Sequence, residues 1–133
     1  MSRYVIRPDV AIALARDEAV IREEHELLAP TLLRSQVLSL LYRAVRDGEL
    51  SQQEAENAIG YVRRLKLRLL GDRVLQSVAW DMADQLDWPD TLDAEYVALT
   101  RLQADALVTL DRKLARAAAA LVATAAYDTL LTA

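Results

Sequence analysis

Residues 90–111 read DTLDAEYVALTRLQADALVTLD, and this stretch predicts one helix, one strand and the start of a second helix. The first helix is expected from Asp93, because an acidic residue there precedes a mostly apolar segment and suits a helix start. The strand is expected over residues 106–110, a short apolar run. Asp111 ends that run and opens the next helix. The two aspartates are either ordinary helix caps or half of a metal site.

Short apolar strands alternate with long helices on the amino-terminal side of this stretch. Strands are expected over residues 4–6 and 27–29, and helices over residues 10–15, 33–44, 55–71 and 74–86. Gly48 supplies the stop between the second and third helices, and Ser51 with Glu54 forms a capping box for the third. Such alternation is typical of an α/β fold, with a small parallel sheet flanked by helices.

Two further segments have weaker patterns. Residues 17–26 are mostly charged and form a weak helix at best, and the alanine-rich residues 115–127 are expected to continue the last helix. In parallel sheets of this kind, ligands collect beyond the carboxyl ends of the strands. Arg7, Asp9 and Asp111 all follow predicted strands, so we expect them to share a pocket.

Composition limits the kind of protein this can be. A chain of 133 residues, 53% of them hydrophobic, suffices for one domain spanning residues 1–133. It contains no cysteine, which excludes disulfides and thiolate chemistry, and its net charge of -4 argues against a broad basic surface for nucleic acid. No apolar run approaches the roughly 20 residues of a membrane span, and we expect a cytoplasmic protein without a membrane partner.

Two segments of the chain resemble the PIN domains, in particular the VapC-type toxins of bacterial toxin-antitoxin pairs. The first is LDAEYVALTRLQADALVTLDRKLARA (residues 92–117), and the second is LLAPTLLRSQVLSLLYRAVRDGELSQQEA (residues 27–55). The resemblance implies a PIN-like three-layer fold and an endoribonuclease that cuts RNA with Mg2+ or Mn2+ held by acidic residues. It also implies a homodimer and a cognate antitoxin that lays a helix into a groove beside the active site.

Carried over position by position, the resemblance assigns two acidic ligands and reveals two departures. Asp93 and Asp111 match acidic positions of the family, and Thr109 matches a frequent hydroxyl near the site. Arg7 stands where the family has an aspartate, and Gln36 stands where it has a glutamate. Arg7 places a permanent cation at the position of a metal ligand.

If the chain is active, the resemblance implies Asp111, Asp93 and Asp9 as metal ligands, with Gln36 positioning water. Asp9 lies two residues after Arg7, so on an extended segment it would share the same face and could partly replace the missing ligand; once a helix starts it would only cap. Asp90 is a turn residue after Trp88 and Pro89, and a reserve candidate for the pocket.

In a second hypothesis the site holds no metal ion. The Arg7 guanidinium would pair with Asp93 and Asp111 and replace the cation, leaving a PIN fold without the nuclease reaction. Two functions therefore remain open: an endoribonuclease with an incomplete set of acids, and a catalytically impaired module that binds RNA or a protein.

Other side chains receive structural interpretations. The single histidine, His25, is expected to be solvated and without a role, and the basic residues between 63 and 68 are expected to form a solvated helix face. Leu65, Leu67, Leu69 and Leu70 are too many apolar residues for one buried helix face, so we expect part of them to form an interface.

Overall fold

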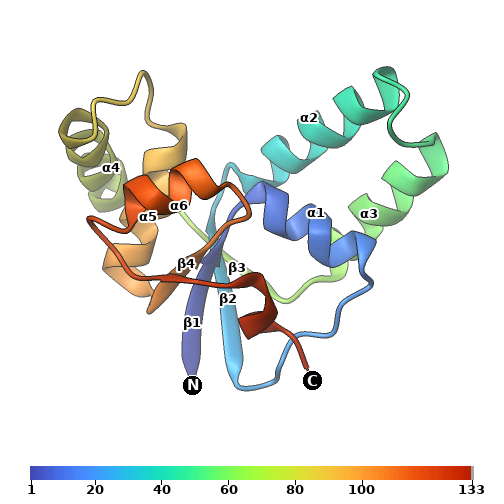
Figure 1. The fold of residues 1–133 in the computed structure, drawn as a ribbon, viewed down its shortest axis with the longest axis horizontal. Helices are drawn as coiled ribbons and strands as arrows, with labels where there is room; N and C mark the ends of the chain where they lie inside the picture. Colours follow the sequence, from blue (N-terminus) through green and yellow to red (C-terminus); the bar gives the residue numbers. More distant parts are fainter. Residues whose placement is uncertain (133) are drawn as a thin grey trace.

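The computed structural model describes residues 1–132, in which one sheet is covered by helices (Figure 1). In chain order the elements are β1 (Ser2–Ile6), α1 (Pro8–Arg16), β2 (His25–Pro30), α2 (Leu33–Arg46), α3 (Gln52–Arg64), β3 (Leu67–Leu70), α4 (Arg73–Gln85), α5 (Leu92–Gln103), β4 (Ala106–Val108), α6 (Arg112–Ala118), β5 (Thr124–Ala125) and a 3-10 helix, η1 (Tyr127–Leu130).

The sheet has five strands in the order β3-β2-β1-β4-β5, and every pair is parallel. The chain first moves outward from β1 to β2 and β3, and then crosses back over to β4 and β5. The direction of winding therefore reverses between β1 and β4. At such a reversal the connections leave in opposite directions, which opens a crevice beyond the carboxyl ends of the two strands.

Helices form a layer on each face of the sheet (Figure 1). α1, α2 and α3 pack against one another in one layer. In the other layer α5 packs against α4 and against β1, β2 and β4. This division follows from right-handed crossovers. Helices that connect strands toward β3 then lie on one face of the sheet, and helices that connect strands toward β5 lie on the other. The predicted α/β class, a parallel sheet flanked by helices in three layers, is confirmed.

The central strands are apolar on both faces because both faces are covered. Val5 and Ile6 of β1 and Leu107 and Val108 of β4 are each 0% exposed. A parallel strand between two helical layers needs such a continuous apolar run. In the described part of the chain, no helix combines the length and the apolar character needed to cross a membrane.

The predicted turn between the second and third helices is confirmed. Ser51 Oγ accepts a hydrogen bond from the Glu54 backbone N–H at 3.0 Å, and Glu54 Oε1 accepts one from the Ser51 N–H at 3.0 Å. Gly48 has φ 77, in the left-handed region that glycine adopts at little cost. These local signals fix where α2 ends and where α3 begins.

The expected length of the third helix is wrong. α3 ends at Arg64, and Leu67–Leu70 is the edge strand β3, paired with β2. Leu65, Leu67, Leu69 and Leu70 are partly buried against the core, so the predicted interface is not needed to explain them. The apolar excess arose because a strand was interpreted as the end of a helix.

The two weaker patterns also lead to corrections. Residues 17–26 contain no helix: Glu18 has φ 47 just after α1, and β2 begins at His25. The alanine-rich segment does not continue as one helix, because α6 ends at Ala118 and Thr124–Ala125 pairs with β4 as β5. Alanine has a high helix propensity, but pairing with the edge of the sheet overrides it.

Candidate functional site

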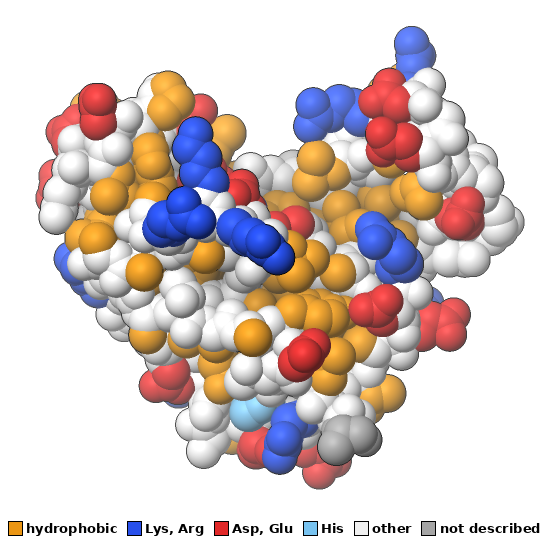
Figure 2. Space-filling model, in the orientation of Figure 1, with side chains coloured by type: hydrophobic (Ala, Val, Ile, Leu, Met, Phe, Trp, Pro, Cys, Tyr) orange, Lys and Arg blue, Asp and Glu red, His pale blue; other side chains and the backbone are white. Residues whose placement is uncertain are grey.

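The candidate site lies at the carboxyl ends of β1 and β4, where the winding of the sheet reverses. Its residues are Arg7 after β1, Asp9 in the first turn of α1, Asp93 in the first turn of α5 and Thr109 after β4. Figure 2 shows the surface hollowed between the arm formed by α2 and the lobe formed by α4 and α6. We call this hollow the notch.

Arg7 provides the central cation of the notch. Its Nη2 lies 2.6 Å from Asp93 Oδ1, and its Nη1 lies 3.5 Å from Asp9 Oδ2. The side chain is only 15% exposed, and its Cζ sits 5.8 Å from the centre of the Tyr96 ring. The electron-rich face of the ring and the two carboxylates all attract the guanidinium and hold it in place. The predicted pairing of Arg7 with Asp93 is confirmed.

Local structure explains why Arg7 and Asp9 reach the same place. Arg7 is the N-cap of α1, with φ -91 and ψ 167, and Pro8 occupies the first helical turn. The chain is still extended at Arg7 and becomes helical after it, so the side chains of residues 7 and 9 both remain near the end of β1. Asp9 also suits the first turn, where the helix dipole favours a carboxylate.

Asp9 joins α1 to the end of β4 rather than only capping its own helix. Its Oδ2 accepts hydrogen bonds from the Leu110 N–H and from Thr109 Oγ1, both at 3.1 Å, while its Oδ1 accepts one from the Val10 N–H at 2.8 Å. The Thr109 hydroxyl also accepts a hydrogen bond from Arg7 Nη1 at 3.4 Å. Thr109 is therefore hydrogen-bonded to both Arg7 and Asp9.

Asp111 is a helix cap, which is one of the two roles that the sequence left open for it. Its Oδ1 accepts a hydrogen bond from the Leu114 N–H at 3.0 Å and caps α6, and its side chain is exposed. Its own N–H donates to Thr109 Oγ1 at 3.1 Å. Within residues 1–132 no ion pair joins Arg7 to Asp111, so that part of the hypothesis is wrong. The nearby first-turn N–H groups of α6 satisfy this carboxylate locally.

Gln36 contacts a residue that sequence reasoning missed. Its Oε1 accepts a hydrogen bond from the Tyr96 hydroxyl at 2.5 Å, which links α2 to α5. Tyr96 is fully buried, and burial raises the pKa of its phenol far above the ordinary tyrosine value. A signal was available, since Tyr96 lies three residues after Asp93 and residues at that spacing share a helix face.

Asp90 and His25 take no part in the contacts that join Arg7 to Asp9, Asp93 and Thr109. Asp90 Oδ1 accepts a hydrogen bond from the Leu92 N–H at 3.0 Å, which is the predicted turn role before α5. His25 is half-buried and not solvated as predicted: its Nε2 lies 3.0 Å from the Thr129 carbonyl oxygen, and its ring meets Tyr4 edge-on at 5.0 Å. It begins β2, at the opposite end of the sheet from the notch.

The residues of the notch do not fit a divalent cation. Mg2+ and Mn2+ require several oxygen ligands converging on one point. Here Asp93 and Asp9 face the Arg7 guanidinium, Asp111 caps α6, and the Gln36 oxygen already accepts from Tyr96. In the described residues, no group of three or more histidine or acidic side chains is arranged to hold a metal ion.

Comparison with known proteins supports the architecture. No family model matches the chain, and no curated protein matches it. Fold and strand order define a three-layer α/β protein with a parallel sheet. The chain is similar to the crystal structure of PAE2754 from Pyrobaculum aerophilum, with a TM-score of 0.74 and 21% identity over 96% of this chain and 91% of that one. Likeness at this identity shows a shared fold.

Proposed function

We propose that this chain is a VapC-like PIN-domain protein in which Arg7 takes the place of the catalytic cation, so that it binds RNA without hydrolysing it. The observation that carries the proposal is the half-buried Arg7 guanidinium, 2.6 Å from Asp93 and 3.5 Å from Asp9. The family assignment rests on the sequence resemblance, and the position of Arg7 beside Asp93 and Thr109 supports it.

Arg7 can neutralise carboxylates but cannot replace the chemistry of a metal ion. A divalent ion coordinates water directly and lowers its pKa, which generates a nucleophile at neutral pH. A guanidinium offers only N–H donors and keeps its charge at all physiological pH values. The competing function, an endoribonuclease using Asp93, Asp111 and Asp9 as metal ligands, requires Arg7 to leave the pocket and the Asp111 carboxylate to leave its cap.

Exposed cations beside the notch support RNA binding. Arg34 lies in the first turn of α2, and Arg112 and Lys113 lie in the first turn of α6; all three are exposed. Both helices start at the carboxyl ends of strands, so these cations flank the notch, and Figure 2 shows Lys and Arg side chains gathered beside the hollow. In the described part of the chain they form no ion pair, which leaves their charge available to phosphates.

Fluorescence anisotropy with a labelled single-stranded oligoribonucleotide tests this proposal. The Arg112→Glu, Lys113→Glu variant is expected to bind at least about tenfold more weakly than wild type at low ionic strength, with a shallower salt dependence. Arg64→Glu, Lys66→Glu is the matched control, because it changes the charge equally at the other end of the sheet. Equal losses in both variants would remove the notch as the RNA site. Cleavage with Mn2+ that disappears in Asp93→Ala would establish the nuclease instead.

A groove between α2 and α3 favours a second function, binding of a protein partner. The groove has a volume of about 210 Å³, and its walls are Val37, Leu38, Ile59 and Val62 with an arginine at positions 34 and 63. Leu38 is 56% exposed, although it is a large apolar side chain. An amphipathic helix with acidic flanks, such as the antitoxin that the resemblance implies, would match this surface.

Co-purification of this chain with a protein encoded next to it tests whether a protein partner binds the groove between α2 and α3. Leu38→Asp should abolish it, and Leu102→Asp, another exposed leucine, should not. The homodimer that the resemblance implies is tested by light scattering of the purified chain.

A further inference from the structure

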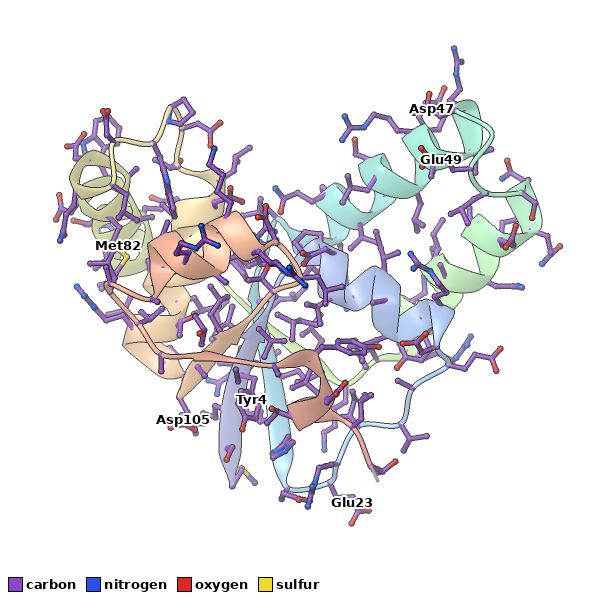
Figure 3. All side chains as sticks on the ribbon, in the orientation of Figure 1. Tyr4, Glu23, Asp47, Glu49, Met82 and Asp105 are labelled. Atoms are coloured by element: carbon purple, nitrogen blue, oxygen red, sulfur yellow. The ribbon has the colours of Figure 1, made fainter. Side chains whose placement is uncertain are left out.

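A second cleft lies at the amino ends of β2 and β3, at the opposite end of the sheet from the notch. Its volume is about 860 Å³, and it is bounded by residues 19–23, the end of α3 and the start of β3. Figure 3 shows Glu23 at this end of the molecule, far from Asp47 and Glu49 at the tip of the α2 arm. We call it the amino-end cleft.

The wall of the amino-end cleft is apolar and held in place. Ile21, Leu65 and Leu67 are half-buried there, and Val20 beside them is 67% exposed. The Tyr61 hydroxyl donates to the Ala19 carbonyl oxygen at 2.7 Å, which fastens the loop to α3. The loop is fastened on its other side as well, by the antiparallel bridge between Ile21 and Leu131. The cleft is therefore preformed in the free chain.

The charge of the amino-end cleft is opposite in sign to that of the protein. Four cations and two carboxylates line it, whereas the whole chain has a net charge of -4. Two of the cations already have partners: Arg68 lies 3.5 Å from Glu26, and Arg22 lies 2.6 Å from Glu24. Over residues 1–132, Arg64 and Lys66 have no ion pair. Both are exposed, on either side of the half-buried Leu65.

We propose that the amino-end cleft binds a small amphiphilic anion, with its apolar body on the wall formed by Ile21, Leu65 and Leu67 and its carboxylate at Arg64 and Lys66. The volume is within the range of pockets for small ligands, roughly 300–1,000 Å³. Apolar burial supplies affinity for the body of the ligand, and the two unpaired cations select an anionic head. This site is independent of the notch and of the function proposed for it.

Calorimetric titration with octanoate tests the site, with octanol as the uncharged ligand of the same chain length. Octanoate is expected to bind the wild type more tightly than octanol, and Arg64→Glu, Lys66→Glu should weaken octanoate binding by about tenfold or more, because attraction becomes repulsion. Val20→Asp should weaken the binding of both ligands, because it adds a charge to the apolar wall. It alters an exposed side chain, and circular dichroism checks that each variant is folded.

The matched control is Arg112→Glu, Lys113→Glu, which makes the same charge change at the notch and should leave octanoate affinity within about twofold of the wild type. Equal affinity for octanoate and octanol would overturn the assignment of the anionic head. Octanoate binding that is unchanged in the Arg64→Glu, Lys66→Glu variant, or absent from the wild type, would overturn the site.

Discussion

The double variant Arg7→Asp, Gln36→Glu is expected to bind Mn2+, and the wild type is not. In the wild type a metal ion entering the notch would meet the guanidinium that already neutralises Asp93 and Asp9. Arg7→Asp removes that cation and adds a third carboxylate at the end of β1. Gln36→Glu adds a fourth and keeps an oxygen that can accept from the Tyr96 hydroxyl.

Coulomb's law gives the size of the change. At an effective dielectric of about 20, a unit charge and a divalent ion about 4 Å apart interact by roughly 8 kcal/mol, and reversing the sign of residue 7 changes the energy by roughly 16 kcal/mol. This is an upper bound, because the Asp93 side chain is 45% exposed and solvent screens it. Even about a tenth of it would change the dissociation constant by more than tenfold.

Thermal unfolding with increasing Mn2+ measures this binding. At a concentration about 100 times the dissociation constant, the ion stabilises the folded chain by about 2.7 kcal/mol, which for a domain of this size raises Tm by roughly 10 °C. The same titration of the double variant carrying Asp93→Ala shows whether the ion binds at the notch. A Tm increase in the wild type as large as in the double variant would refute the exclusion of metal by Arg7.

Three further predictions concern stability. Tyr96→Phe should lower the free energy of unfolding by about 1 kcal/mol, through loss of the hydrogen bond to Gln36. Burial raises the pKa of Tyr96, so above about pH 10 the phenol loses its proton in the unfolded chain before it does in the folded one. The free energy of unfolding of the wild type should therefore fall with pH by up to about 1.4 kcal/mol per pH unit more steeply than that of Tyr96→Phe. Denaturant titrations that give the same pH dependence for both proteins would contradict this. Asp111→Ala should cost about 1 kcal/mol and Asp111→Ser much less, because serine also caps α6; equal losses would show that the cap is unimportant. Ser51→Ala should cost a similar amount in urea unfolding, and an unchanged midpoint would mean that the capping box of α3 adds no stability.

Local chemistry made parts of the fold predictable. The end of α2 and the start of α3 follow from Gly48 and from the Ser51 and Glu54 capping box, whose groups lie within a few residues of one another. The central strands β1 and β4 were visible as short apolar runs, because a strand covered on both faces has no polar alternation. Helices of definite amphipathic period such as α4 were also found within a residue or two.

Edge strands were not predictable in the same way. Only Leu65 and Lys66 separate β3 (LRLL) from α3, and neither is a glycine or proline that would signal the end of a helix. Its conformation is decided by pairing with β2, from Leu27 with Leu67 to Pro30 with Leu70. β5 likewise exists because Thr124 and Ala125 meet Leu107 and Val108, against the helix propensity of the alanines around it.

Sequence by itself determined the alternation of strands and helices, and with it the position of Arg7 and Asp9 at the carboxyl edge of a parallel sheet. The sequence also places an arginine at position 7, and arginine keeps its positive charge in any fold. Only the tertiary structure decided which carboxylates that cation would meet, since Arg7 and Asp93 are 86 residues apart and their distance depends on how α5 packs on β1. Asp111 had a backbone partner within its own helix, and the local hydrogen bond formed there instead of a distant ion pair.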